Sequence, residues 1–420
     1  MPTSLPIPCE NLPSGNYHGR IIEQSENTNL IIVLIKDRLF RLIMEENVKL
    51  PMGSLISFNL NLDKKLEKIK IKNSVLKFEE NGDIFRWTKS TKNPSRMEFL
   101  KTRHQIIHGI RRWFDQQNFV ETETPMLVSA PSPEAQFFPV KTDKGYLITS
   151  PEYQMKRLLV GGFDKIFQIS RCFRDHEKSP QHNPEFTMLE WYRTYEPLEK
   201  LMTDIEQLVL HLSDSVKSNL LSKTIPLPPW PRKSVSSLFK KHIGINLDGY
   251  ETANELRKKA ELSGYQKLFH DLPESSNLTD SLAYEQTFFR LWQYIQNRFS
   301  QSNPVFVFDW PLPLASLARK NSKSGKFAER VELYANCMEL ANGFAELTDP
   351  IEQSRRFEQD LKNRKSEGRK TVPLDKKFLK SLEQGLPECS GMALGIDRLI
   401  MWFCGTENIQ DVICFREDEI

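Results

Sequence analysis

The sequence lacks the features that mark several large classes of protein. Its six cysteines form no Cys-x-x-Cys pair and no Cys/His cluster with zinc spacing, which argues against a structural zinc site and favours a reducing compartment. The longest apolar run, LIIVLI, is too short to cross a bilayer. The segment MPTSLPIPCENLPSG has no basic stretch leading into an apolar core. We therefore expect a cytoplasmic protein without a signal peptide or membrane contact.

Two common nucleotide-binding loops are also missing. The chain has neither a Gly-x-x-x-x-Gly-Lys-Ser/Thr loop nor a Gly-x-Gly-x-x-Gly loop, which argues against P-loop and dinucleotide-binding proteins. The formal charge of +3, from 58 basic and 55 acidic residues, neither requires nor excludes an RNA partner. With 420 residues, 39% of residues hydrophobic and 27% charged, the chain is typical of a globular protein with more than one domain.

The first part of the chain reads as all-β. Short segments rich in Ile, Leu, Val and Phe alternate with turn-forming residues; they are YHGRIIEQ, NLIIVLI, RLFRLIME, SLISFNLN and KIKIKNSVLKF. Five such strands predict a small β-barrel of the oligonucleotide-binding (OB) type over residues 1–88. The composition of TKSTKNPS indicates a linker, which we place at residues 89–96.

Residues 97–420 mix helices with strands. Apolar residues recur at helical spacing from Phe99 to Phe114 and again after Pro197. KIFQIS and FVFDWP read as strands, and FAERVELYANCMELANGFAEL reads as a long strand unit with a break at Asn342–Gly343. The polar stretch 214–300 reads as helical and otherwise carries little information. Strands outnumber helical crossovers, so we predict an α+β domain built on a mostly antiparallel sheet flanked by helices.

The stretch HNPEFTMLEWY places a carboxylate inside an apolar strand. Alternation puts Phe186, Met188, Glu190 and Tyr192 on one face. Phe186 and Glu190 are then roughly 13 Å apart along the strand, which suits the two ends of a long ligand. A core strand whose Glu pairs with a buried Arg explains the pattern equally well.

Other charged residues interrupt apolar segments. They are Arg171 and Arg174 in ISRCFRDHE, Glu339 and Glu346 in MELANGFAEL together with the polar Asn342, and Asp397 and Arg398 in GMALGIDR. Buried charges need partners. Arginines with carboxylates suggest a polyphosphate and a divalent metal ion, although structural ion pairs remain an alternative.

These segments together resemble a known family. FRDHEKSPQHNPEFTMLEWY is similar to motif 2, GMALGIDRL to motif 3 and VETETPML to the dimer-interface motif 1 of class II aminoacyl-tRNA synthetases of the lysyl type. SPEYQMKRLLVGG, MELANGFAELTDPIEQSRRFEQD and LPECSGMALGIDR resemble one branch more closely, the ligases that attach lysine to elongation factor P. The resemblance covers about residues 97–420.

The resemblance implies a class II synthetase-like fold, a homodimer, and activation of (R)-β-lysine or lysine by ATP and Mg²⁺, followed by transfer to a lysine of elongation factor P. It assigns ATP binding to Arg174, His176, His182, Asn183, Phe186, Glu339 and Arg398, with Arg174 and Arg398 catalytic. It assigns the lysine pocket to Ser150, Glu152, Glu190, Tyr192, Asn342, Gly343, Glu346 and Ala393, and Mg²⁺ to Glu339 and Glu346.

Two departures keep other readings open. His176 stands where the family has Glu, although Glu177 follows, and the ligase branch typically lacks an N-terminal barrel. The alternatives are a lysyl-tRNA synthetase-like enzyme that charges tRNA and a non-catalytic, RNA-binding paralogue. Ala393 favours the ligase branch, because the matching residue is Gly in lysyl-tRNA synthetases.

Overall fold

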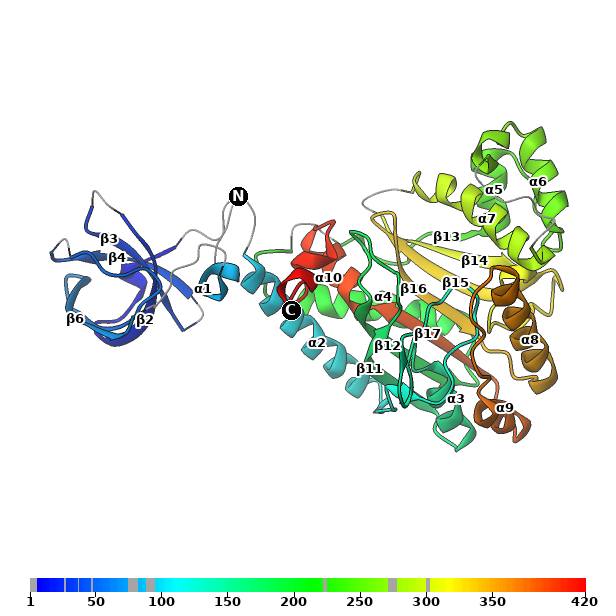
Figure 1. Ribbon diagram of the computed structural model, residues 1–420, viewed down its shortest axis with the longest axis horizontal. Coiled ribbons are helices and arrows are strands. Elements are labelled where there is room, and N and C mark those ends of the chain that lie inside the picture. Colours follow the sequence, from blue (N-terminus) through cyan, green and yellow to red (C-terminus); the bar gives the residue numbers. More distant parts are fainter. Residues whose placement is uncertain are drawn as a thin grey trace. The chain divides into compact units, whose positions relative to one another are not determined.

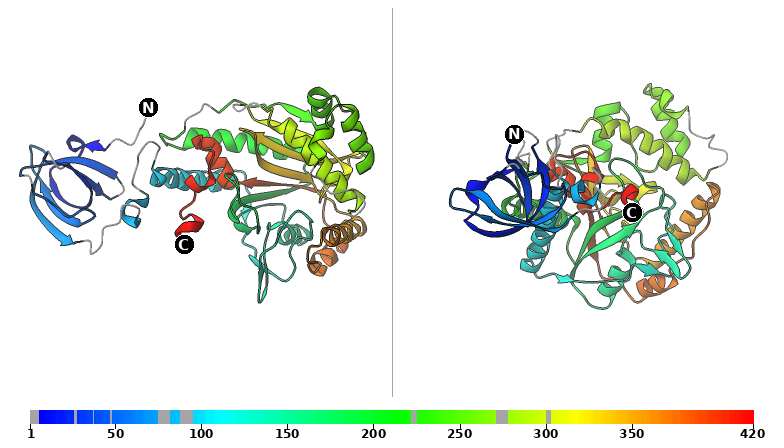
Figure 2. Two further views of the ribbon diagram at one scale, coloured as in Figure 1. Left: turned by 45° about the horizontal axis from the view of Figure 1, so that its top comes forward. Right: turned by 60° about the vertical axis from the view of Figure 1, so that its left-hand side comes forward.

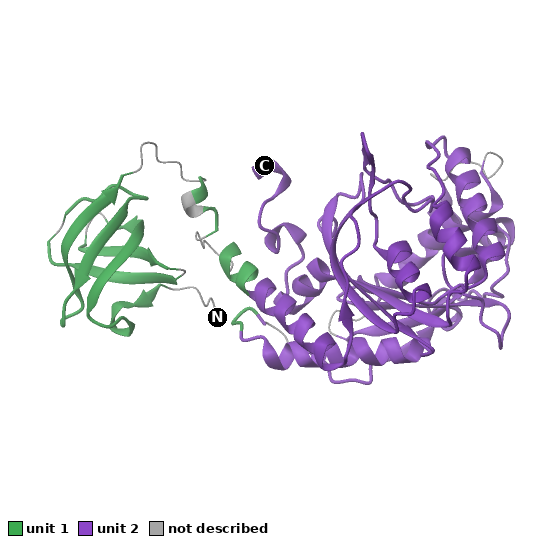
Figure 3. Ribbon diagram, turned by 90° about the horizontal axis from the view of Figure 1, so that it is seen from below, with its two compact units in different colours: residues 1–101, 218–220 green, residues 102–217, 221–420 purple. Residues whose placement is uncertain are grey.

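The computed structural model describes residues 6–25, 28–36, 38–46, 48–74, 82–87, 95–221, 225–270, 278–299 and 303–420. It divides into two compact units (Figure 3), which are residues 1–101 with 218–220, and residues 102–217 with 221–420. The division lies within helix α2 (Arg96–Gln116). Most of the predicted linker, namely residues 89–94 of 89–96, lies outside the described residues.

The first unit is a small closed barrel (Figure 1). Its strands are β1 (Ile7–Pro8), β2 (Gly15–Gln24), β3 (Leu30–Ile35), β4 (Arg38–Met44), β5 (Leu55–Leu60) and β6 (Lys65–Asn73). They pair in the order β1-β4-β3-β2-β5-β6, and β4 also pairs with β6, which closes the ring. Along β3 the alternate residues Ile31, Val33 and Ile35 fill the interior. The five predicted strands are present, and the last part of KIKIKNSVLKF lies outside the described residues. A short helix, α1 (Asp83–Arg86), follows.

The second unit is built on a sheet of eight described strands (Figure 1). In spatial order these are β13 (Arg232–Ser234), β14 (Val305–Pro311), β15 (Phe327–Ala335), β16 (Met338–Ala345), β17 (Cys389–Gly395), β12 (Glu185–Thr194), β11 (Lys165–Phe173) and β7 (Val120–Glu121). The end pairs β13–β14 and β11–β7 are parallel and the inner pairs are antiparallel. A small sheet of β8 (Leu127–Val128), β9 (Lys141–Thr142) and β10 (Gly145–Leu147) lies apart. The α+β prediction is confirmed.

One face of the large sheet is covered by α2, α4 (Leu198–Ser215) and α10 (Ile396–Cys404). The ring of Phe114 from α2 stacks on Phe167 and meets Trp191 edge-on. Arg193 of β12 forms a buried ion pair with Asp204 of α4. Since Trp191 and Arg193 point to this face, alternation turns Glu190 and Tyr192 to the other face.

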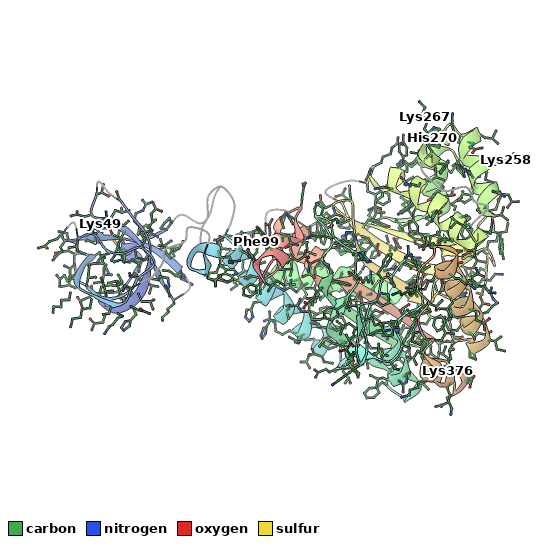
Figure 4. The ribbon with its side chains drawn as sticks, in the orientation of Figure 1. Lys49, Phe99, Lys258, Lys267, His270 and Lys376 are labelled. Atoms are coloured by element: carbon green, nitrogen blue, oxygen red, sulfur yellow. The ribbon has the colours of Figure 1, made fainter. Side chains whose placement is uncertain are left out.

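The remaining helices are α3 (Glu152–Val160), α5 (Val235–Ile243), α6 (Ala253–Leu262), α7 (Asp280–Gln296), α8 (Pro350–Ser366) and α9 (Lys376–Glu383). Helices α5, α6 and α7 gather beyond the β13–β14 edge (Figure 2). The polar stretch 214–300 therefore shares an apolar core with β14 and β15, in which Phe239, Phe288 and Trp292 stack. Its polar composition comes from exposed residues such as Lys258 and Lys267 (Figure 4).

The predicted break at Asn342–Gly343 is wrong. β15 and β16 form a hairpin whose turn is Asn336–Cys337, with φ of 52° and 60°. Two successive left-handed residues are what a two-residue hairpin turn requires. Asn342 and Gly343 instead lie within β16 and pair with β17. Among the described residues, no helix is both long and apolar enough to cross a membrane.

Candidate active site

A cavity of about 600 Å³ lies on the face of the sheet opposite to α4 and α10. Among its lining residues are most of the predicted site residues: Ser150, Glu152, Arg174, His182, Asn183, Phe186, Glu190, Tyr192, Glu339, Asn342, Glu346, Ala393 and Arg398. His176 and Gly343 do not line it. Asn342 lines the cavity, so the next residue, Gly343, faces the other side of β16. A Cβ on Gly343 would lie 2.7 Å from the Met392 side chain, so this glycine allows close packing of β16 on β17.

Strand β12 supplies one wall of the cavity by alternation. Phe186, Met188, Glu190 and Tyr192 all line it, as the two-residue period predicted. In the sheet register Glu190 lies opposite Ala393 of β17, and Ala393 lies opposite Asn342 of β16. A carboxylate, a methyl group and an amide therefore form one row across three strands.

The carboxylate of Glu190 is buried and only partly satisfied. The side chain is 2% exposed, and its Oε1 accepts a hydrogen bond of 2.5 Å from the Tyr192 hydroxyl. Its Oε2 has no hydrogen-bond partner among the described residues. Burial, followed by the charge of Glu152, raises the pKa of Glu190 to about 8. The buried arginine of this strand, Arg193, pairs with Asp204 on the other face, so Glu190 is not half of a structural ion pair with Arg193.

Two further carboxylates share one lysine next to Glu190. Lys156 Nζ lies 2.6 Å from Glu152 Oε1 and 2.6 Å from Glu346 Oε2. Burial raises the pKa of Glu346 to about 8 although Lys156 opposes the shift. Burial likewise raises the pKa of Glu152. This end of the cavity therefore has more carboxyl groups than cations, and a cationic ligand would favour their ionised form.

Gly391 of β17 allows this end of the cavity to form. A Cβ on Gly391 would lie 2.3 Å from the Tyr192 ring and 2.5 Å from Glu346 Oε1. Both contacts are far shorter than normal van der Waals distances. A side chain of any size at this position would displace two groups of the acidic end.

The opposite end of the cavity carries two arginines. The guanidinium of Arg174 lies 4.1 Å from the Phe137 ring centre and 5.1 Å from that of Phe186. Arg398 donates a hydrogen bond of 2.8 Å to the backbone oxygen of Glu339. Aromatic rings and backbone carbonyls hold both arginines in place, and their remaining donors suit phosphate oxygens.

His182 orients Arg398. Its Nε2 lies 2.6 Å from Arg398 Nη2, and its Nδ1 lies 2.7 Å from Ser179 Oγ. A guanidinium can only donate, so Nε2 accepts and the ring proton resides on Nδ1. Burial, then the charges of Arg398 and Arg174, lowers the pKa of His182 to about 4. The neutral ring therefore leaves the arginine charge intact.

The placement of His176 corrects its assignment to ATP binding. Its side chain is 71% exposed and lies outside the cavity lining. Its φ of 62° is left-handed, which shifts the loop so that the next residue, Glu177, lines the cavity 3.9 Å from Arg174. Glu177 thus occupies the place beside Arg174 for which a carboxylate was expected.

The shared Mg²⁺ site of Glu339 and Glu346 also needs correction. Glu346 lies just beyond the end of β16 and contacts Lys156 at the acidic end of the cavity. The carboxylate near Glu339 is Glu332 of β15, whose pKa is raised to about 7 by burial and then by the charge of Glu339. Arg330 and the Tyr334 hydroxyl hold Glu332. Two adjacent carboxylates fit a divalent cation that takes its other ligands from phosphate and water.

Two charges that interrupted apolar segments have structural partners. Asp397 accepts a hydrogen bond of 2.5 Å from Arg103 and another of 2.7 Å from the Thr187 backbone N–H, which ties α2, β12 and α10 together. Arg171 is 48% exposed and lies 3.6 Å from Glu185. Asp397 and Arg171 therefore both have partners within the protein, as the alternative of structural ion pairs predicted.

Sequence reasoning missed Glu332 and the role of Lys156. Glu332 precedes Glu339 by seven residues across the hairpin and lies opposite Asn342 in the register. Once the turn at Asn336–Cys337 is known, the hairpin places Glu332 near Glu339. Lys156 lies one helical turn after Glu152, and this i, i+4 spacing was the available sequence pattern.

Comparison with known proteins gives consistent matches. The family of class II tRNA synthetases (D, K and N) matches residues 84–419. A protein of Pectobacterium atrosepticum is 38% identical over 326 residues, which cover 75% of this chain and 94% of the relative. A relative from Salmonella dublin is 37% identical over 345 residues, which cover 79% of this chain and 98% of the relative. A relative from Proteus mirabilis is 37% identical over 330 residues, which cover 75% of this chain and 94% of the relative. All three are named elongation factor P–(R)-β-lysine ligase.

Proposed function

We infer the activity from one premise, namely that this chain belongs to the family of class II tRNA synthetases (D, K and N). We propose that it is an ATP-dependent, AMP-forming ligase. It activates (R)-β-lysine, or lysine, as an adenylate and transfers the lysyl group to a lysine side chain of elongation factor P. The names of the relatives supply the substrates of this proposal.

The observation that carries the proposal is the opposite charge at the two ends of one cavity. Glu152, Glu190 and Glu346 form the acidic end, and Arg174 with Arg398 form the basic end. Phe186 and Glu190 lie on the same face of β12, roughly 13 Å apart. A lysyl-adenylate has amines at one end and a phosphoryl group with an aromatic base at the other. The cavity therefore matches the intermediate at both ends.

In the first step a carboxylate oxygen of lysine attacks the α-phosphorus of ATP, and pyrophosphate leaves. Arg174 and Arg398 stabilise negative charge that develops on the phosphoryl oxygens. Phe186 stacks on the adenine, and His182 keeps Arg398 aligned through its 2.6 Å contact. Glu332 and Glu339 would hold Mg²⁺, which supplies Lewis-acid stabilisation of the phosphates. Glu190 and Tyr192 hold an ammonium group of lysine in place.

In the second step the neutral ε-amine of the acceptor lysine attacks the carbonyl carbon of the adenylate. An amide bond forms, AMP leaves, and the amine loses a proton. No side-chain nucleophile is needed, because the adenylate already carries a good leaving group. The protein's contribution is to align the two reactants and exclude water from the adenylate.

Ala393 supports the preference for a β-amino acid. Its methyl group lies in the row between Glu190 and Asn342, where the substrate's amine and backbone would sit. A methyl group in that row removes space beside the substrate's α-carbon. It therefore favours a substrate whose amine is on the β-carbon, one carbon further from the carboxylate. We therefore propose (R)-β-lysine over α-lysine.

We also propose a cytoplasmic homodimer. Apolar residues in and beside the motif 1 stretch are exposed in the single chain: Val120 is 50%, Met126 48% and Leu127 42% exposed. Such a row suits a subunit interface. Sedimentation velocity tests this point, since a monomer at micromolar concentration would contradict it.

Activation is tested by ATP–pyrophosphate exchange with (R)-β-lysine, lysine and norleucine. The expected order is (R)-β-lysine first, lysine second, and no exchange with norleucine, which lacks the second amine. Ala393→Gly should move the preference toward lysine. Equal exchange with norleucine would contradict the proposed pocket, and an unchanged preference in Ala393→Gly would contradict the role of the methyl group.

A second candidate function is the charging of tRNA. The observation in its favour is the closed N-terminal barrel, which precedes the matched family region and resembles an oligonucleotide-binding domain. Ala393 and the names of the relatives favour the ligase. The acceptor that receives the lysyl group distinguishes the two.

A further inference from the structure

Lys156 is a buried charge that the proposed reaction does not use. Its side chain is 1% exposed and does not line the cavity. It contacts Glu152 of its own helix and Glu346, which follows β16, each at 2.6 Å. The lysine therefore lies behind two carboxylates that face the cavity.

We propose that Lys156 is a positioning residue that sets how many positive charges the amino-acid pocket takes from its substrate. This inference rests on the proposed function. When all three are ionised, Glu152, Glu190 and Glu346 supply three negative charges, and Lys156 cancels one of them. Two remain, which equals the number of ammonium groups on a diamino acid. An unpaired buried charge is costly, so a mono-amino acid leaves the pocket unbalanced.

The geometry separates this role from that of an ordinary structural ion pair. A structural pair needs one carboxylate, whereas Lys156 bridges two from different parts of the chain. The third carboxylate, Glu190, keeps an oxygen without a hydrogen-bond partner among the described residues. Lys156 thus leaves Glu190 free to bind an ammonium group. It holds Glu152 and Glu346 in place, and its one positive charge is shared between these two carboxylates.

The charge on Lys156 is permanent in the working range of pH. Burial alone would lower the pKa of its ammonium, but Glu152 and Glu346 outweigh burial and the pKa lies above its usual value. The charged and titratable groups that influence this end of the cavity are Glu134, Glu152, Tyr153, Glu190, Tyr192, Arg319, Glu346 and Cys389. The carboxylates among them therefore determine how lysine binding depends on pH.

The test compares wild type with Lys156→Met, which keeps the length of the side chain and removes its charge. Lys156 opposes the raised pKa of Glu152 and of Glu346, so without the lysine both carboxyl groups hold their protons more strongly and bind an ammonium poorly. KM for lysine in ATP–pyrophosphate exchange should rise about tenfold or more, the effect of losing about 1.4 kcal/mol of binding, while kcat changes less. The defect should shrink toward pH 9 as the carboxylates ionise. Isothermal titration calorimetry with lysine measures the same change without turnover.

A chemical rescue supplies the control for folding. Lys156→Ala leaves space for a small cation, so n-butylammonium should restore lysine binding and n-butanol should not. The double variant Lys156→Met/Glu152→Gln, in which the pocket again carries two negative charges, should recover affinity relative to Lys156→Met. If the single variants do not fold, recovery of folding in the double variant but not in Lys156→Met/Glu185→Gln supports the same charge count.

Three results would overturn the inference. They are an unchanged KM and pH profile in Lys156→Met, equal rescue by n-butanol and n-butylammonium, and no recovery in the double variant. These differ from failure of the proposed function, in which wild type itself shows no exchange dependent on lysine or (R)-β-lysine. In that case the affinities of wild type and Lys156→Met for lysine, measured by calorimetry, still test the role of Lys156.

Discussion

At the scale of single residues, the amino-acid pocket is distinguished by having more buried carboxyl groups than cationic side chains. Alternation along HNPEFTMLEWY was sufficient to place Glu190 and Phe186 on one face, and the cavity confirms that placement. Depth in the cavity could not be read from the sequence. Glu346 was expected to share Mg²⁺ with Glu339, yet it pairs with Lys156 because the strand carries it to the other end.

The raised pKa of Glu190 predicts how stability and binding change with pH. In the folded, unliganded protein the pKa of Glu190 is about 8, above the ordinary value for Glu, so folding favours the protonated form. Stability should fall as pH rises from about 4.5 to about 8, while lysine affinity rises over the upper part of that range because the ammonium needs a carboxylate. Thermal melts and calorimetry from pH 5 to 9 measure both trends.

Glu190→Gln should remove most of the pH dependence of both stability and lysine affinity. It should also reduce lysine-dependent exchange by about a hundredfold, because a charged hydrogen bond worth about 2–3 kcal/mol is lost. The matched control is Glu185→Gln on the same strand, whose carboxylate is 52% exposed and should leave both trends unchanged. Equal pH profiles for wild type and Glu190→Gln would show that another group titrates.

The neighbours His176 and Glu177 form a second residue-scale test. Because Glu177 lines the cavity beside Arg174 and His176 is exposed, Glu177→Gln should raise KM for ATP about tenfold, and His176→Ala should change it less than about twofold. Steady-state exchange with varied ATP measures both. The reverse ranking would restore the original assignment of His176.

At the scale of elements, the site depends on how three strands approach one another. The sequence predicted the segments of β12, β15 and β16 as strands, but it placed a break at Asn342–Gly343, whereas the hairpin turn lies at Asn336–Cys337. Asn-Gly is a strong turn pattern, and here the pairing of Asn342 and Gly343 with β17 overrides it. That error hid Glu332, because its nearness to Glu339 depends on the true turn.

The close approach of β17 to Tyr192 predicts an effect of adding one methyl group. Gly391→Ala should destabilise the protein by about 1–3 kcal/mol and remove most exchange activity, since the methyl would meet the Tyr192 ring and Glu346. Gly395→Ala is the control on the same strand, where the nearest atoms lie at 3.9 Å. Chemical denaturation and exchange assays compare the two. Similar behaviour of both variants would mean that β17 is free to move away.

At the scale of the whole molecule, composition and patterning predicted a β-barrel followed by an α+β unit. Both are present. The helical character of residues 214–300 was predicted, but their part in an apolar core was not, because exposed lysines and other polar residues mask widely spaced aromatic residues.

Removal of residues 1–88 should leave adenylation largely intact. The barrel has its own core, the family match begins at residue 84, and the site residues all belong to the second unit. Exchange rates of the full chain and the truncated chain should agree within about threefold, a difference of less than about 1 kcal/mol. A truncated protein that folds, as judged by circular dichroism, but fails to form adenylate would show that the barrel supports the active site.

The central claim is that the lysyl group passes to a protein and not to tRNA. The most direct measurement incubates the full chain with ATP, Mg²⁺ and labelled (R)-β-lysine in the presence of both elongation factor P and bulk tRNA, then follows the label and the intact mass of elongation factor P. We predict that elongation factor P gains the mass of one lysyl residue and that tRNA stays unlabelled. Label in tRNA with an unchanged mass of elongation factor P would contradict the account.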